Sequence, residues 1–280
     1  MKKVIVTGGL GFIGSNLISL LLKKKYSVIN VDKVTYSANF YNVREFKNAT
    51  NYKFIKADIN NKKKLNQIFN KYKPKTIFNL AAETHVDRSI DGPENFIKSN
   101  ILGVFSLLEV FKKFSKNNKN SKLIHISTDE VYGDVLSGRT NENHAYQPSS
   151  PYAATKAASD HLVSSYIRTY NLPAIISNCC NNYGPGQYPE KLIPLTIKNL
   201  NRGRKTCLHD GGEPYRCWLH ADDTAEAVIK IIESGKLNEI YKTYCRHKST
   251  KIMGNLWYKQ PMSRTRTAIL LDALQYHILY

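Results

Sequence analysis

No apolar run in this 280-residue chain approaches the ~20 residues that a membrane-spanning helix needs. The first residues show no secretory signal pattern, because Met1 leads directly into a predicted strand. Cysteine is scarce as well: the five cysteines are an odd number and contain no Cys-x-x-Cys pair. We therefore expect a cytoplasmic protein with no membrane partner, no disulfide framework and no metal site.

Acidic residues are few against the basic ones: 22 Asp and Glu stand against 41 Lys and Arg, and the formal net charge is +19. Such an excess suggests nucleic-acid binding when aromatic residues are interleaved or a DNA-binding motif is present. Here the lysines accompany asparagines in polar stretches such as residues 60–64 and 112–122. We expect a solvated surface and no nucleic-acid partner, although basic charge would also attract a diphosphate.

Strand patterns alternate with longer helical patterns along the chain. The strands are predicted at residues 2–7, 27–31, 52–56, 76–80, 123–127 and 174–178, and the helices at 12–25, 63–72, 95–116, 151–170, 191–201 and 222–233. This alternation indicates an α/β fold with a doubly wound, Rossmann-type parallel sheet. We expect residues 1–178 to form that domain, 179–240 part of a smaller substrate lobe, and 241–280 a divergent tail.

The predicted helix 95–116 carries apolar residues around much of its circumference, so it has to bury more than one face. A homodimer formed through this helix would explain the pattern, and a deep core position would explain it nearly as well. We expect the homodimer.

Three glycines, Gly8, Gly11 and Gly14, follow the first predicted strand. In this spacing the first permits a tight turn, the second lets the backbone approach a pyrophosphate, and the third permits close helix packing. The helix that follows offers free N–H groups to phosphates. Asp32 ends the second strand, where a carboxylate binds the adenosine ribose and repels a 2′-phosphate. The sequence therefore predicts an NAD site that disfavours NADP.

Tyr152 and Lys156 lie four residues apart at a predicted helix start, so both side chains project from one face. A lysine ammonium stabilises a phenolate and brings the tyrosine pKa toward the working range of a base, and Lys156 can also hold the nicotinamide ribose. Asp129 and Glu130 follow an earlier strand; adjacent carboxylates can take opposite roles when their environments separate their pKa values. By themselves, both patterns also fit ordinary structural positions.

Together these segments resemble the extended short-chain dehydrogenase/reductase superfamily and, within it, the dTDP-glucose 4,6-dehydratases. Residues 126–133 resemble the dehydratase signature rather than that of the sugar 4-epimerases, which typically have serine and small residues where Asp129 and Glu130 stand. Residues 34–36, 81–89, 150–156, 178–185 and 189–194 are similar to dehydratase segments in order and spacing. The likeness covers roughly residues 1–240.

The resemblance implies a role for particular residues. Asp129 would protonate the leaving 6-hydroxyl, Glu130 would remove the C5 proton, and Thr128 would bind the 4-hydroxyl. Tyr152 would take the proton of that hydroxyl, beside Lys156. The implied NAD contacts, with the motif residues, are Gly8, Gly11, Phe12, Ile13, Gly14, Asp32, Asp58, Ile59, Ala81, Ala82, Ser99, Tyr152, Lys156 and Asn182. The implied substrate contacts are Thr84, Thr128, Asn181, Lys191 and Arg216, the last suited to a diphosphate.

The likeness weakens before residue 240 and then ends. Within residues 207–218 the lead-in is one residue short, and Cys217 stands where the family usually has aspartate. From about Lys242 the sequence matches nothing expected of the family, and its ending is shorter. The resemblance therefore implies a truncated C-terminal substrate lobe, with weaker substrate binding and modest stability. A divergent tail that works is the alternative.

The predicted function is that of an NAD-dependent lyase of deoxysugar biosynthesis. It would convert dTDP-glucose to its 4-keto-6-deoxy derivative by C4 oxidation, loss of water across C5 and C6, and hydride return to C6. Three alternatives stay open: a UDP-glucose 4,6-dehydratase, a UDP-sugar 4-epimerase, which needs only the oxidation half, and an NAD-binding paralogue with little activity.

Overall fold

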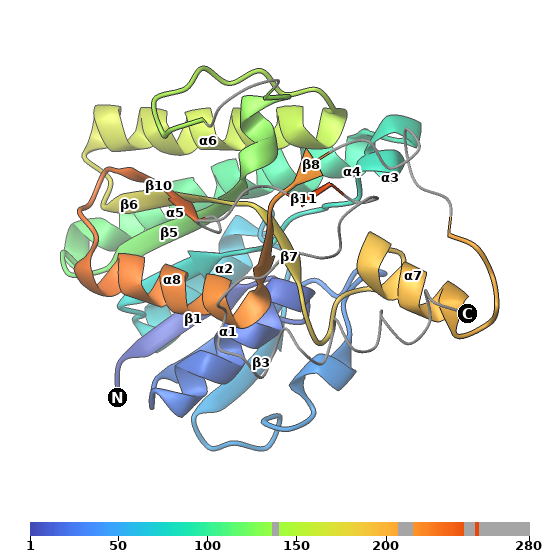
Figure 1. Cartoon of the computed structure of the whole chain (residues 1–280). Helices are drawn as coiled ribbons and strands as arrows, with labels where there is room; N and C mark the ends of the chain where they lie inside the picture. The colour runs from blue at the N-terminus through green and yellow to red at the C-terminus, as the bar shows by residue number, and fades with distance from the viewer. Residues whose placement is uncertain (136–139, 207–214, 244–249, 252–280) are drawn as a thin grey trace.

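A computed structural model describes residues 1–135, 140–206, 215–243 and 250–251, and within them seven parallel strands form one sheet (Figure 1). The strands are β1 (Lys3–Thr7), β2 (Ser27–Asp32), β3 (Tyr52–Lys56), β4 (Thr76–Asn79), β5 (Lys122–Thr128), β6 (Ala174–Cys179) and β10 (Ile240–Thr243). Their order is β10-β6-β5-β4-β1-β2-β3, so the direction of winding reverses between β1 and β4. The predicted doubly wound fold is confirmed.

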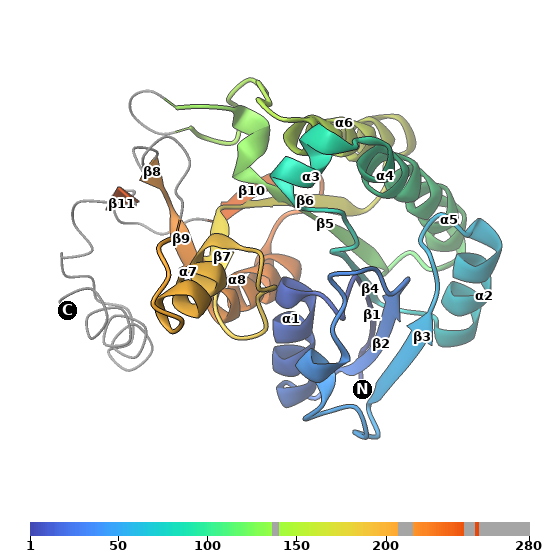
Figure 2. The same ribbon diagram turned by 90° about the vertical axis from the view of Figure 1, so that its right-hand side faces the viewer.

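Helices cover both faces of the sheet (Figure 2). One face carries α1 (Phe12–Lys23) and α8 (Ala221–Ser234), and the other carries α2 (Lys62–Tyr72), α5 (Gly103–Asn117) and α6 (Pro151–Tyr170). Val4 and Val6 pack with the first layer and Ile5 packs with the second, because successive side chains of a strand point to opposite faces. This double burial explains why the inner strands β1, β2, β4, β5 and β6 are rich in apolar residues, whereas the edge strands β3 and β10 contain lysines at positions inside the strand.

The helix ends follow from local chemistry. Ser150 caps α6 by accepting a hydrogen bond from the backbone N–H of Ala153 (3.1 Å), and Pro151 occupies the first turn. At the other end, Asn171 adopts the left-handed conformation that closes many helices. The start of α6, which carries two of the predicted catalytic residues, is therefore firmly defined.

The predicted helix 95–116 is not one regular α-helix. It consists of α4 (Glu94–Phe96), the π-helix η2 (Ile97–Leu102) and α5. The wider turn of η2 buries the polar residues Ser99 and Asn100, and such π-turns often occur at functional sites. The remaining short elements are η1 (Phe40–Val43), α3 (Val86–Asp91), η3 (Asp129–Tyr132), β7 (Asn181–Tyr183), α7 (Leu192–Leu200), β8 (Tyr215–Arg216), β9 (Trp218–His220) and β11 (Thr250–Lys251).

Two elements from the C-terminal third belong to the sheet assembly. Helix α8, within the predicted substrate lobe, packs on α1, and β10, at the start of the predicted tail, pairs in parallel with β6. Of the predicted tail, residues 241–243 and 250–251 are described; the rest of it, and residues 207–214, lie outside the described ranges. Nowhere in the described ranges does a helix combine the length and hydropathy needed to cross a bilayer.

Candidate active site

A cavity of about 370 Å³, a size typical of small-molecule sites, opens where the winding of the sheet reverses. Its wall includes most of the predicted site residues: Gly8, Gly11, Phe12, Ile13, Gly14, Asp32, Ile59, Ala81, Ala82, Thr84, Ser99, Thr128, Glu130, Tyr152, Lys156, Asn181, Asn182 and Lys191. Asp58, Asp129 and Arg216 are not in the wall. The Asp58 carboxylate instead accepts hydrogen bonds from the backbone and side-chain nitrogens of Asn60.

The turn after β1 and the first turn of α1 each require a glycine. Gly8 has a φ of 70°, and a Cβ added there would lie 2.8 Å from the backbone of Leu80 and Ala81. A Cβ on Gly14 would lie 2.3 Å from the carbonyl oxygen of Gly8. Helix α1 begins directly after the turn that follows β1, with no side-chain cap on its N-terminus. The first N–H groups of the helix are therefore suited to bind a pyrophosphate.

Asp32 is held at the carboxyl end of β2. Its two carboxylate oxygens accept hydrogen bonds from the backbone N–H groups of Leu10 (3.0 Å) and Val34 (2.8 Å). Burial raises the pKa of Asp32, and the two hydrogen bonds oppose that rise. Each oxygen keeps a further lone pair, so the carboxylate can also accept from ribose hydroxyls.

Tyr152 and Lys156 project from the first two turns of α6. The backbone N–H of Tyr152 donates to Ser89 Oγ (3.1 Å), and Lys156 Nζ donates to the carbonyl oxygen of Ile126 (2.7 Å). Burial raises the pKa of Tyr152 well above its usual range, whereas a hydrogen bond with Thr128 lowers it. Burial lowers the pKa of Lys156. The pKa of Tyr152 is thus raised and not lowered as expected from the lysine, because desolvation favours the neutral form of each group.

The acid pair lies at the end of β5. Thr128 Oγ1 accepts a hydrogen bond from the backbone N–H of Glu130 (3.2 Å) and so starts the short helix η3. Burial raises the pKa of Asp129 to about 6, although the charges of Lys242 and Arg216 lower it. The pKa of Glu130 rises through burial and through the charge of Asp129. Two coupled carboxyls of this kind can share one proton, so that one donates while the other accepts.

Two residues join the segment after β6 to the cavity. Asn182 accepts a hydrogen bond from Thr224 Oγ1 (2.5 Å) and donates to the carbonyl of Cys180 (2.7 Å). Lys191 donates to the carbonyl of Thr84 (3.0 Å), and burial lowers its pKa. The side chains of Asn182 and Lys191 are therefore both held by hydrogen bonds in the cavity wall.

A further cluster received no role from the sequence. Glu190 accepts hydrogen bonds from the Arg88 guanidinium (3.0 and 3.3 Å) and from the Tyr36 hydroxyl (3.2 Å). The guanidinium carbon of Arg88 also lies 4.1 Å from the centroid of the Tyr36 ring. These residues connect the segments after β2, β4 and β6 around the cavity. All three residues stand in segments that resemble the family. The position of Glu190 next to the predicted substrate contact Lys191 was the feature of the sequence that could have indicated a role for this cluster.

Comparison with known proteins finds relatives that belong to the sugar-nucleotide dehydratases. The GDP-mannose 4,6 dehydratase family profile matches residues 5–255. A dTDP-glucose 4,6-dehydratase from Salmonella typhimurium is 44% identical over 255 residues, which are 85% of this chain and 71% of that protein. One from Escherichia coli is 46% identical, over 85% of this chain and 70% of that protein.

Among solved structures, a dTDP-glucose 4,6-dehydratase from Streptomyces venezuelae, crystallised with NAD, is 36% identical with a TM-score of 0.85. The match covers 98% of this chain and 81% of that one. A UDP-glucose 4-epimerase from Thermotoga maritima is less similar, at 29% identity and a TM-score of 0.80, over 89% of this chain and 79% of that one.

Proposed function

The chain belongs to the dTDP-glucose 4,6-dehydratase family, and we propose that it is an NAD-dependent hydro-lyase acting on dTDP-glucose. The observation that carries the proposal is that Thr128 and Glu130 line the same cavity as Tyr152, Lys156 and the glycine turn. A 4-epimerase needs the tyrosine and the cofactor, but it has no use for a carboxylate base beside the sugar.

The residues of the cavity fit NAD. There is no room for side chains at Gly8 and Gly14, and the uncapped start of α1 suits the pyrophosphate. Asp32 would accept from the adenosine ribose, while Ile59, Ala81 and Ala82 provide apolar wall. Bound there, NAD would supply the hydride acceptor for C4 of the sugar and, once reduced, the hydride donor for C6.

The oxidation step uses the α6 pair. Tyr152 takes the proton of the 4-hydroxyl, and Thr128, which bonds to Tyr152, orients that hydroxyl. Lys156 holds the nicotinamide ribose and supports the charge that develops on Tyr152. Burial raises the pKa of Tyr152 and so favours the neutral phenol, which cannot act as a base. A nearby positive charge that stabilises the phenolate is therefore needed before Tyr152 can take the proton.

The elimination step uses the acid pair. The 4-ketone makes the C5 proton acidic, and Glu130, in the cavity wall, removes it. Asp129, whose pKa of about 6 keeps part of the population protonated near neutrality, protonates the departing 6-hydroxyl. Since Asp129 is outside the wall, this role requires a small movement or a bridging water.

Four predicted residues would bind the rest of the substrate. We assign Thr84, Asn181 and Lys191 to the sugar and its phosphates, because all three line the cavity and Lys191 bonds to the Thr84 carbonyl. Arg216 stands in β8, outside the wall, and would reach the diphosphate from the edge. The similar relatives are dTDP-glucose 4,6-dehydratases, which favours the thymidine nucleotide as the substrate of this chain. A UDP-glucose 4,6-dehydratase would use the same oxidation and elimination steps.

The outer side of η2 and α5 suits a second copy of the chain. Ile97, Leu102 and Phe105 are 44%, 50% and 37% exposed, while Leu108 and Phe111 of α5 are buried in the core. Such a patch of large apolar side chains typically marks a protein interface. We propose a homodimer. Sedimentation should show twice the 31.9 kDa mass for the parent and a monomer for Leu102→Glu, whereas a monomeric parent would exclude it.

The cellular location follows from the chemistry. The substrate class and NAD belong to cytoplasmic pools, and the buried Cys179 and Cys180 are free thiols, as expected in a reducing compartment. We therefore propose that the enzyme works in the cytoplasm, which fractionation of cells that express it would test.

Two variants test the assignment of steps. Glu130→Gln keeps the shape of the side chain but cannot accept the C5 proton, and loss of a positioned base typically costs about 10²–10⁴-fold. It should accumulate enzyme-bound NADH when dTDP-glucose is added, measured by absorbance, whereas Tyr152→Phe should form almost none. If both variants and the parent yield only a C4-epimerised sugar, the proposal is wrong. If the parent binds NAD but turns over neither dTDP-glucose nor UDP-glucose, it is an inactive paralogue.

A further inference from the structure

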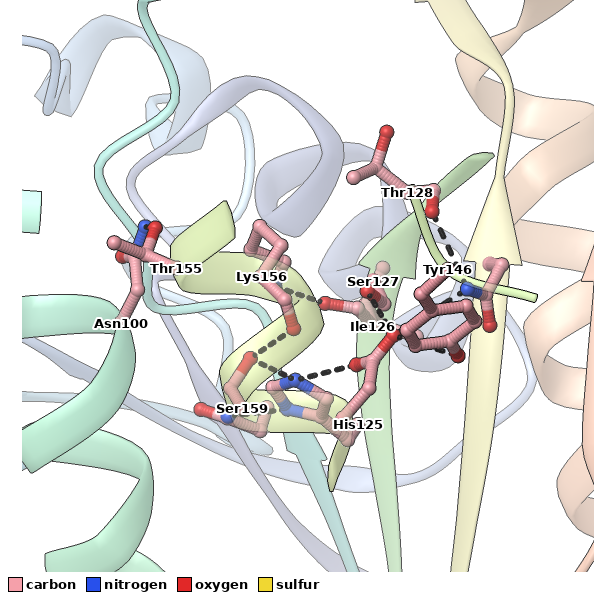
Figure 3. A network of polar contacts seen from close by, with 12 residues as sticks. Asn100, His125, Ile126, Ser127, Thr128, Tyr146, Thr155, Lys156 and Ser159 are labelled. Carbon is pink, nitrogen blue, oxygen red and sulfur yellow. Dashed lines mark hydrogen bonds and ion pairs between the residues drawn. The ribbon is translucent and has the colours of Figure 1, made fainter. Parts of the chain in front are cut away.

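A buried polar network lies behind the α6 pair (Figure 3). Lys156 and Ser159 of α6 face the strand β5, where Lys156 bonds to Ile126 and Ser159 contacts His125. Asp160, one helical turn after Lys156, is 1% exposed. None of the steps proposed above uses Asp160, and burial of a carboxylate is costly unless it serves as a partner to a charge.

The Asp160 carboxylate is held by neutral groups. Its Oδ2 accepts hydrogen bonds from Ser127 Oγ (2.7 Å), the Tyr146 hydroxyl (3.2 Å) and Asn178 Nδ2 (3.4 Å). Its Oδ1 makes no hydrogen bond but lies 3.4 Å from His125 Nε2. The position of the carboxylate is therefore fixed, but these contacts alone do not supply a full positive charge.

His125 is not that charge. The Thr7 hydroxyl donates to Asn79 Oδ1 (2.7 Å), which leaves Asn79 Nδ2 to donate to His125 Nδ1 (2.9 Å). The neutral ring then carries its proton on Nε2 and donates it to Ser159 Oγ (3.2 Å), whose own hydroxyl donates to the Lys156 carbonyl. Complete burial, together with the charge of Lys156, lowers the pKa of His125 well below its usual value. A Ser–His–Asp cluster this deeply buried has no access to a substrate.

Lys156 is the cation that Asp160 acts on. The charge of Asp160 raises the pKa of Lys156 against the effect of burial, and the charge of Lys156 lowers the pKa of Asp160, which burial brings to about 6. The two residues stand at i and i+4 on one helix face. Lys156 Nζ otherwise has the Ile126 carbonyl, a neutral acceptor.

We propose that Asp160 is a positioning residue for the oxidation step: its buried carboxylate is the counter-charge that keeps Lys156 an ammonium beside Tyr152. The role in the oxidation step rests on the proposed function, whereas the charge state of Lys156 can be measured without turnover. A fully buried lysine without a counter-charge can lose its proton near neutral pH. Neutral Lys156 would then no longer support a phenolate at Tyr152.

The other titratable groups around this pair are few. His125 faces it from β5, Cys179 from β6, and Tyr146 and Tyr132 from the segments after β5. Burial raises the pKa of Cys179 to about 12 and that of Tyr132 to about 12. Burial likewise raises the pKa of Tyr146. Above the Asp160 pKa of about 6 and below the pKa values of these three groups, then, the three groups and His125 stay neutral while Asp160 is ionised.

The test follows the protonation of Lys156 directly. NAD-loaded protein labelled with ¹³C at lysine Cε is titrated by NMR, and the Lys156 signal is identified by its loss in Lys156→Met. In Asp160→Asn the midpoint of Lys156 should fall by at least about one pH unit, a tenfold loss of proton affinity. Ser127→Ala removes a neutral hydrogen bond from Asp160, so it should leave the midpoint near the parent value.

An unchanged midpoint in Asp160→Asn, or an equal fall in Ser127→Ala, would overturn the proposal. If Asp160→Asn does not fold, the titration of the parent protein tests the proposal. Its Lys156 signal should show a second inflection near pH 6, where Asp160 takes up a proton. A signal that does not change near pH 6 would refute the coupling. NADH formation from dTDP-glucose is measured in the same samples. Asp160→Asn could lower the Lys156 midpoint as expected while the parent forms no NADH from dTDP-glucose. That result would contradict the proposed function and leave the role of Asp160 in place.

Discussion

Replacing Asp32 with asparagine should weaken the discrimination between NAD and NADP. The carboxylate is fixed by the N–H groups of Leu10 and Val34, so it cannot turn away from a 2′-phosphate on the ribose. Two unit charges about 5 Å apart repel by roughly 3 kcal/mol at an effective dielectric constant of ~20. About 100-fold of the preference for NAD should therefore disappear in Asp32→Asn, at ~1.4 kcal/mol per factor of ten.

The same substitution should also weaken NAD itself. Asparagine offers one acceptor oxygen in place of two, so either Leu10 or Val34 loses its hydrogen bond, at a cost of about 1–3 kcal/mol. Calorimetric titration of cofactor-free protein with each dinucleotide measures both effects. Asp91→Asn is a matched control, because Asp91 is exposed at the end of α3 and lies outside the cavity wall. A parent that binds NADP as tightly as NAD, or an Asp32→Asn ratio equal to the parent ratio, would refute the reasoning.

Three further predictions concern other parts of the site. Glu190→Gln removes the charge that links three segments around the cavity, so bound NAD should dissociate several-fold faster in stopped-flow chase experiments; an unchanged rate would remove Glu190 from cofactor retention. Gly14→Ala places a Cβ 2.3 Å from the Gly8 carbonyl and should lower both the melting temperature and NAD affinity, by roughly 1–3 kcal/mol in stability, whereas a parent-like melting curve would contradict the packing argument. Lys242 lowers the pKa of Asp129, so Lys242→Met should raise that pKa above about 6 and move the alkaline fall of the pH–rate profile upward; Lys242→Arg should not move it, and a downward shift would reverse the assigned sign.

Local chemistry accounts for what the sequence predicted correctly. Five of the six predicted strands are buried on both faces, and therefore consist of apolar runs that differ clearly from the helical patterns. The sixth, β3, lies at the sheet edge and shows exposed lysines at Lys53 and Lys56. The glycine turn, the Ser150 cap and the spacing of Tyr152 and Lys156 are also local features, so their positions could be placed before the fold was known.

What the sequence missed depends on contacts between distant residues. β10 was not predicted, because its four residues form a strand only by pairing with β6. The π-helix η2 places Ser99 and Asn100 inward, and the 3.6-residue period does not show such a turn. The raised pKa of Tyr152 comes from burial by several elements, and the Glu190 cluster joins residues about 100 or more positions apart.

The most direct test of the dehydratase mechanism uses dTDP-glucose that carries deuterium at C4. The hydride removed by the bound cofactor should return to the same sugar, so the 4-keto-6-deoxy product should carry that deuterium at C6 and one solvent hydrogen at C5, where Glu130 removed the proton. Mass spectrometry and NMR of the product measure both positions. A 6-deoxy product without the C4 deuterium, or deuterium found solely at C4 of an epimerised sugar, would contradict the proposed mechanism.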